Sequence, residues 1–82
     1  MWIKTVQTRF NNQTIEVASW LSDTNDDGNE VVKTQSMVNE YYLIEETIFP
    51  NRDAAYDYVK HYSPSMAKAF LNRTAYLEGA MG

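Results

Sequence analysis

The sequence contains no cysteine, one histidine, two prolines and three glycines. Without cysteine there is no disulfide, and small secreted domains usually depend on disulfides, so we expect a reducing, cytoplasmic location. The lone histidine, His61, has no second histidine or cysteine with which to share a transition metal. The glycines are scattered at Gly28, Gly79 and Gly82, which excludes a glycine-rich loop of the kind that cradles phosphates. We expect no cofactor and no metal.

A long apolar run is also missing. The first nine residues mix apolar and polar side chains, a pattern that predicts neither a signal peptide nor a membrane span. With 82 residues, of which 44% are hydrophobic, the chain predicts one domain over residues 1–82. A domain of this size buries only roughly 60% of the surface that its unfolded chain exposes. It therefore needs most of its apolar residues for its own core.

The first half of the chain is rich in valine, isoleucine, threonine and tryptophan, which favour strands. Trp2, Val6 and Phe10 predict a half-buried first strand, and the turn residues 11–13 follow. Residues 14–21 predict the second strand of a hairpin. The polar segment 22–29 ends in the turn-forming Asp-Gly-Asn sequence and predicts a loop, after which residues 30–38 predict a third strand.

Residues 39–49 fit two patterns. Tyr42, Ile44 and Ile48 lie at the even spacing of a strand, whereas Met37, Tyr41, Ile44 and Ile48 also fit the spacing of a helix. The run is short and Pro50 follows closely, so we predict a strand over residues 41–47.

The last third of the chain is helical in pattern. Asn51 can cap a helix over the stripe of Ala55, Tyr58, Val59 and Tyr62. Ser63-Pro64 then ends this helix and begins a second one, for which Gly79 provides a C-cap. We predict an α+β fold: an antiparallel sheet of about four strands followed by two C-terminal helices packed on one face, in the order ββββαα.

The charge is unevenly distributed along the chain. The formal net charge is −4, but residues 16–57 carry ten acidic residues against two basic ones, a net −8. The ends are basic, with Lys60, Lys68 and Arg73 near the C-terminus. Surface-prone tyrosines and an acidic middle predict a docking surface for a basic partner. Three basic residues give only a thin footprint for nucleic acid, which we keep as an alternative and expect to be a minor one.

The segment Asp23-Thr24-Asn25-Asp26-Asp27-Gly28 spells the front half of an EF-hand calcium loop. This resemblance covers six residues only. The bidentate glutamate expected at the twelfth position is replaced by Thr34, and strands rather than helices are predicted on both sides. A polar hairpin loop is the simpler interpretation, and a small-ligand or calcium-binding module that uses residues 23–28 stays as an alternative.

No catalytic set is evident. A single histidine predicts a residue on a helix surface, and Glu45-Glu46 would point to opposite faces of a strand, so the two carboxylates could not act together. We therefore predict no enzyme but a small acidic protein–protein interaction module that inhibits or regulates a larger protein, and that can also form a homodimer. Small phage-encoded anti-defence proteins act in this way, a comparison of type that rests on no motif. The predicted partner-binding residues are Asp26, Asp27, Glu30, Tyr42, Glu45 and Glu46.

Overall fold

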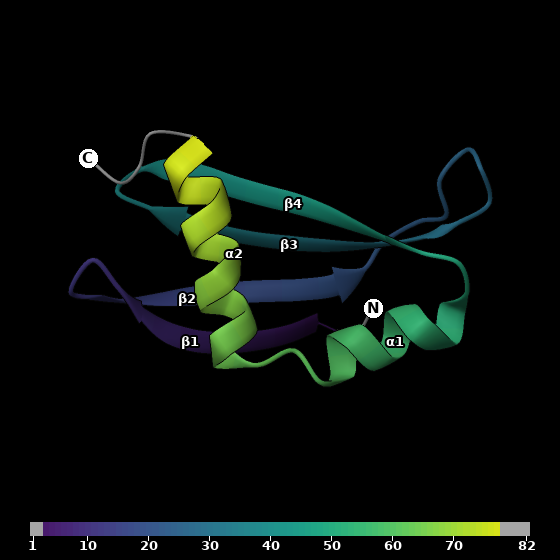
Figure 1. Ribbon diagram of the computed structural model, residues 1–82, viewed down its shortest axis with the longest axis horizontal. Helices are drawn as coiled ribbons and strands as arrows, with labels where there is room; N and C mark the ends of the chain where they lie inside the picture. Colours follow the sequence, from purple (N-terminus) through teal and green to yellow (C-terminus); the bar gives the residue numbers. More distant parts are fainter. Residues whose placement is uncertain (1–2, 78–82) are drawn as a thin grey trace.

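A computed structural model describes residues 3–77 of the chain. Four antiparallel strands form one sheet in the order β1-β2-β3-β4, and two helices follow. Both helices lie on the same side of the sheet: α2 crosses the strands, and α1 lies at the end where the β2–β3 loop projects (Figure 1). The predicted ββββαα fold is therefore confirmed. The element bounds are Ile3–Phe10 (β1), Gln13–Leu21 (β2), Glu30–Val38 (β3), Tyr41–Phe49 (β4), Arg52–Lys60 (α1) and Pro64–Leu77 (α2).

The segment that fitted both a strand and a helix forms β4, and it continues to Phe49 rather than ending at Thr47. It pairs with β3 from Val38↔Tyr41 to Glu30↔Phe49 without a break. Pairing with β3 extends β4 as far as Phe49, and the strand ends before Pro50, which has no backbone N–H to donate. The positions predicted for Trp2 and for the Gly79 cap lie outside the described residues.

Two hairpins are closed by two-residue turns with positive φ at both central positions. Asn11 and Asn12 have φ angles of 52° and 62°, and Asn39 and Glu40 have φ angles of 50° and 74°. This geometry is that of the type I′ turn, which matches the twist of the flanking strands and favours asparagine followed by glycine. Three of the four positions carry asparagine, which tolerates the left-handed region, but Glu40 does not share this tolerance.

We expect the Glu40→Gly substitution to raise the free energy of unfolding by about 0.5–1 kcal/mol, because glycine adopts positive φ without a steric penalty. Glu40 is exposed, so the substitution removes no buried contact. Urea denaturation of both proteins at neutral pH measures the difference. A variant that is less stable than the native chain would show that the turn at residues 39–40 is not strained.

The helix boundaries follow the predicted signals. The side chain of Asn51 accepts a hydrogen bond from the backbone N–H of Ala54 at 2.8 Å, which caps α1. Ser63 Oγ accepts one from the Met66 N–H at 3.3 Å, and Pro64 occupies the first position of α2. Both helices are thus held at their N-termini by the side chains that the sequence singled out.

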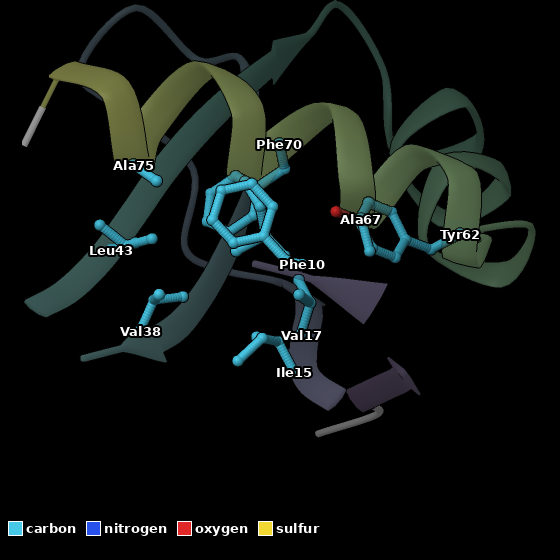
Figure 2. Packing of buried hydrophobic residues seen from close by; sticks show 10 residues of the cluster. Phe10, Ile15, Val17, Val38, Leu43, Tyr62, Ala67, Phe70 and Ala75 are labelled. Carbon is cyan, nitrogen blue, oxygen red and sulfur yellow. The ribbon is translucent and has the colours of Figure 1, made fainter. Parts of the chain in front are cut away.

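The core lies between the sheet and the helices. Its larger part fills the space under α2, where Phe70 and Tyr62 meet Phe10, Val17 and Leu43 from the strands (Figure 2). A smaller part lies under α1, where Ala55 and Val59 pack on Val32. Tyr58 contacts both parts. Ser19 and Thr34 are also buried on this side, with their hydroxyl oxygens 3.2 Å apart. The predicted stripe of Ala55, Tyr58, Val59 and Tyr62 is thus packed against the domain's own sheet.

Tyr62 contributes a buried hydroxyl to this core. The residue is 2% exposed, and its hydroxyl oxygen makes no hydrogen bond to any of residues 3–77. Burial raises the pKa of the Tyr62 phenol, and the neighbouring Tyr58 and Glu45 act in the same direction. The unfolded chain releases this proton near pH 10, whereas the folded chain holds it to higher pH. The stability linked to Tyr62 is therefore complete below about pH 10 and falls as the pH rises above that value.

We expect the Tyr62→Phe variant to be more stable than the native chain by about 1 kcal/mol at pH 7, because the substitution removes a buried hydroxyl that has no partner within residues 3–77. Its advantage should grow above about pH 10, where the native chain gains a proton-linked drive to unfold. Thermal melts at pH 7 and at pH 10.5 measure both effects. Equal stability at pH 7, or an advantage that does not change with pH, would contradict this account.

Within residues 3–77, no helix is long and apolar enough to cross a membrane.

Candidate functional site

The sheet face opposite the helices, hereafter the open face, carries a group of exposed apolar side chains. Strand side chains alternate between faces, so the register assigns to the open face the odd positions of β1 and β3 and the even positions of β2 and β4. Seven large hydrophobic side chains of the described chain are exposed, and five of them lie on this face, with exposures of 48% to 61%. These five are Ile3, Met37, Tyr42, Ile44 and Ile48.

The register places these side chains next to one another. Met37 lies opposite Tyr42 on the neighbouring strands β3 and β4, and Ile48 lies opposite Val31. On the same face, but at the opposite edge of the sheet, Ile3 of β1 lies opposite the half-buried Trp20 of β2. Directly opposed residues of antiparallel strands have Cβ atoms about 5 Å apart, so Met37, Tyr42 and Ile44 form one apolar group. The charged pair Lys33 and Glu46 separates this group from Ile48. The row of Met37, Tyr42, Ile44 and Ile48 is hereafter called the strip.

A shallow hollow of about 330 Å³ opens on this face beside the strip. The small side chain of Ala18 leaves space between its taller neighbours, and Met37 and Tyr42 stand at the rim. The hydroxyl of Tyr42 is hydrogen-bonded to the side chain of Gln35, which fixes the ring beside the hollow. A hollow of this kind can receive one protruding side chain from another molecule. The lining residues are Thr14, Ile15, Glu16, Ala18, Gln35, Ser36, Met37 and Tyr42.

The charges on the open face are balanced. Lys33 and Glu46 lie directly opposite each other on β3 and β4. Arg9 donates hydrogen bonds to Thr14 Oγ1 and to the Asn12 carbonyl oxygen, both at 3.0 Å, and Glu16 is the second acid. Within residues 3–77, two cations and two anions leave the strands of this face without net charge, although the chain as a whole carries −4. The face is therefore neutral and mixed in character: eight of its sixteen strand residues are apolar and eight are polar or charged.

The structure distributes the predicted partner-binding residues over three places. Tyr42 and Glu46 lie on the open face. Glu45 lies on the helix side of the sheet, where it accepts hydrogen bonds from Arg73 at 2.7 and 3.0 Å. This pairing raises the pKa of the Arg73 guanidinium. Glu30 also lies on the helix side, 3.8 Å from Arg52.

The other two predicted residues, Asp26 and Asp27, are exposed in the β2–β3 loop at one end of the molecule (Figure 1). The six predicted residues thus do not form one surface. The predicted set follows from the concentration of acidic residues along the sequence. In the fold, a strand places alternate side chains on opposite faces, and the loop lies beyond the end of the sheet, so these residues are separated. A basic side chain from each helix also faces Glu30 or Glu45, a contact that the sequence did not indicate.

The loop that resembles half of a calcium site is held by Asn25. Its side-chain oxygen accepts hydrogen bonds from the backbone N–H groups of Asp27 and Asn29, at 3.1 and 2.9 Å, and Gly28 has a φ of 81°. Thr34, at the position of the expected bidentate ligand, is buried and bonded to Ser19. In the described part of the chain, no three acidic or histidine side chains gather as metal ligands.

His61 lies at the end of α1 on the helix surface, as predicted. Its ring nitrogen Nδ1 is 3.1 Å from the carboxylate of Asp57 and 3.0 Å from the carbonyl oxygen of the same residue. The hydroxyl oxygens of Ser63 and Ser65, the serines that follow His61 in the sequence, lie 3.2 Å from each other. These contacts are local to the junction between the two helices.

Comparison of the chain with protein-family models, with curated proteins and with solved structures gives no match. The functional argument therefore depends on the geometry of the open face.

Proposed function

We propose that this protein is a small protein-binding module and that the open face is the surface it presents to a larger protein. The observation that carries the proposal is the position of Met37, Tyr42, Ile44 and Ile48, which are exposed on the sheet face opposite both helices. A domain of 82 residues needs its apolar residues for its own core, yet these are in water. A group of exposed apolar side chains with polar residues around it marks an interaction site.

The composition of the strip also favours a protein as the partner. Tyrosine supplies a large contact area at a low cost in side-chain entropy, and methionine adapts its shape to irregular surfaces. The shallow hollow between Ala18 and Tyr42 offers a place for one anchoring side chain. An apolar partner surface would bury the strip, and blocking a larger protein in this way is how a small inhibitor or regulator acts. Anti-defence inhibitors of the phage type are one such class.

The acidic residues have a different role in this proposal. Asp26 and Asp27 lie in the loop beyond the end of the strip, and Glu40 lies in the turn at its other end. Exposed charges at the rim of an interface change the rate of association more than the affinity. We therefore assign the affinity to the apolar strip, and to the acidic residues the steering of a partner with basic groups around its apolar surface.

Affinity capture with matched variants tests the proposal. The tagged protein is incubated with a lysate of its host, and the captured proteins are compared for the native chain, Tyr42→Ser and Tyr56→Ser. Tyr56 is a suitable control, because it is 42% exposed against 55% for Tyr42 and lies on α1, on the other side of the sheet. The proposal expects a stoichiometric partner that Tyr42→Ser loses and Tyr56→Ser retains. Equal capture by both variants would contradict it.

A charge-neutralising variant tests the assignment of steering. We expect Asp26→Asn/Asp27→Asn to bind the captured partner with an association rate several-fold lower at low salt, while the dissociation rate stays unchanged. The difference should vanish at high salt, because the Debye length falls to about 3 Å at 1 M. Binding kinetics on an immobilised partner measure both rates. A faster dissociation at all salt concentrations would show instead that these carboxylates contribute directly to the affinity.

A further inference from the structure

The outer edge of β4 is open and regular. β4 is the last strand of the sheet order, so within residues 3–77 one of its two edges pairs with no other strand. It runs for nine residues in unbroken register with β3 and contains no proline and no lysine. Proteins usually protect an edge strand with lysine, proline, a bulge or a short length. β4 carries the charged residues Glu45 and Glu46, but Glu45 is paired with Arg73 and Glu46 lies opposite Lys33. The opposite edge strand, β1, has Lys4 and Arg9.

The turn between β3 and β4 determines which backbone groups face outward. In a two-residue hairpin the flanking residues, here Val38 and Tyr41, form a hydrogen-bonded pair. Hydrogen-bonded pairs alternate along an antiparallel ladder, so the odd residues of β4 bond to β3. The N–H and C=O groups of the even residues, Tyr42 to Ile48, therefore point away from the sheet along the free edge.

We propose that a second copy of this chain pairs its β4 antiparallel with this edge, about a two-fold axis at Ile44. In this register Ile44 lies opposite Ile44 of the second copy, and Tyr42 lies opposite Glu46. On the helix side Leu43 lies opposite Glu45. Residues that lie opposite each other have the same parity, so each outward-facing residue meets another outward-facing residue and can exchange two hydrogen bonds with it.

The charges select this register over its neighbours. A shift that centres the axis on Glu45 brings two copies of this carboxylate directly opposite each other, and a shift to Glu46 does the same for the other carboxylate. Like charges in directly opposed positions destabilise a sheet. Centring on Leu43 or Thr47 avoids such a pair but shortens the overlap of the strands. The axis at Ile44 gives the longest overlap without opposed carboxylates, and Arg73 neutralises Glu45 beside it at 2.7 Å.

This pairing goes beyond the proposed function because it uses the strand edge rather than the face. In this register the even-numbered residues of both β4 strands lie on the open face, and the odd-numbered residues lie on the helix side. The two four-stranded sheets would therefore form one sheet with all helices on one side. The two open faces would then be continuous, with both copies of Ile44 at the centre. A partner would meet an apolar surface twice as wide and with two-fold symmetry.

A cross-linking test reports the register directly. The native chain has no cysteine, so Ile44→Cys introduces a single thiol. Hydrogen-bonded partners have Cβ atoms about 5.5 Å apart, more than the roughly 3.5–4.5 Å of an unstrained disulfide, so a short bis-maleimide is used to join the two thiols. Ile48→Cys is the control, since Ile48 lies on the same strand and face with 50% exposure against 48% for Ile44. In this register the two copies of position 48 are about 27 Å apart, too far for a short bis-maleimide to join their thiols.

A short bis-maleimide should link Ile44→Cys into a covalent dimer and leave Ile48→Cys unlinked. Equal linking of the two variants would overturn the register. Sedimentation of the unmodified chain up to millimolar concentration tests the association itself, with Glu46→Pro as the second variant. Proline at position 46 removes an outward N–H and leaves the bonds to β3 in place. We expect a native dimer and a monomeric Glu46→Pro. A native monomer over this range overturns the pairing, and the capture experiment above then decides the proposed function separately.

Discussion

Replacement of Phe70 by alanine is expected to lower the free energy of unfolding by about 3–5 kcal/mol. Phe70 is 1% exposed and lies in the centre of the core, where α2 faces the sheet (Figure 2). A domain of this length has a total stability of about 4–12 kcal/mol, at roughly 0.05–0.15 kcal/mol per residue. The cavity would therefore remove a large part of the stability and lower the melting temperature by about 15 °C or more.

The matched control for this substitution is Lys68→Ala on the same helix. Lys68 is exposed, and alanine is a better helix former than lysine, so its melting temperature should change little. Thermal unfolding followed by circular dichroism compares the two variants with the native chain. A loss of less than about 1 kcal/mol for Phe70→Ala would show that α2 does not pack on the sheet as described, because burial of an aromatic side chain contributes more than that.

Tyr42→Ser combined with Ile48→Ser is expected to weaken binding of the captured partner by a factor of at least about 100. Truncation of a central interface residue typically costs about 2 kcal/mol or more, and each 1.4 kcal/mol changes the dissociation constant tenfold. Both side chains are about half exposed in the free protein, so their loss should lower the free energy of unfolding by no more than about 2 kcal/mol, mostly from two cross-strand pairs, and leave the domain folded. This separates a binding defect from a folding defect.

The two single variants refine this prediction. Tyr42 lines the hollow, and Ile48 lies on the same face of β4, six residues further along the strand. One interface could therefore include both side chains. Isothermal titration with the purified partner gives the dissociation constant of each variant. A double variant that binds as tightly as the native chain would remove the open face from the account, whatever the effect of the acidic residues.

The fold could be predicted from the sequence because its signals are local. Asn51, Ser63 and Pro64 determine where helices begin, and the alternation of Ile15 and Val17 determines which face of β2 is buried. The extra two residues of β4 could not be predicted in this way. They are held by pairing with Glu30 and Val31, which depends on tertiary register rather than on local preference.

The candidate site was only partly predictable. The predicted set includes Tyr42 and Glu46, which lie on the open face, but it combines them with acidic residues that are near in the sequence and distant in space. The informative signal lies in the segment Tyr41–Phe49, which has apolar residues at both odd and even positions. A strand covered on one face needs apolar residues at one parity only, so the second set indicates an exposed apolar strip. The pairing of Glu45 with Arg73, which are 28 residues apart in the sequence, could be recognised only in the structure.

Methyl NMR of the isoleucine side chains tests the central claim, that the open face binds a partner, most directly. The chain has isoleucine at positions 3, 15, 44 and 48, of which Ile3, Ile44 and Ile48 lie on the open face and Ile15 is buried on the helix side. On titration with the captured partner, we predict that the methyl signals of Ile44 and Ile48 shift or broaden most, that Ile3 follows, and that Ile15, which is buried but also lines the hollow, shifts least. If Ile15 moves more than Ile44 and Ile48, or if all three open-face signals stay in place on binding, the account is contradicted.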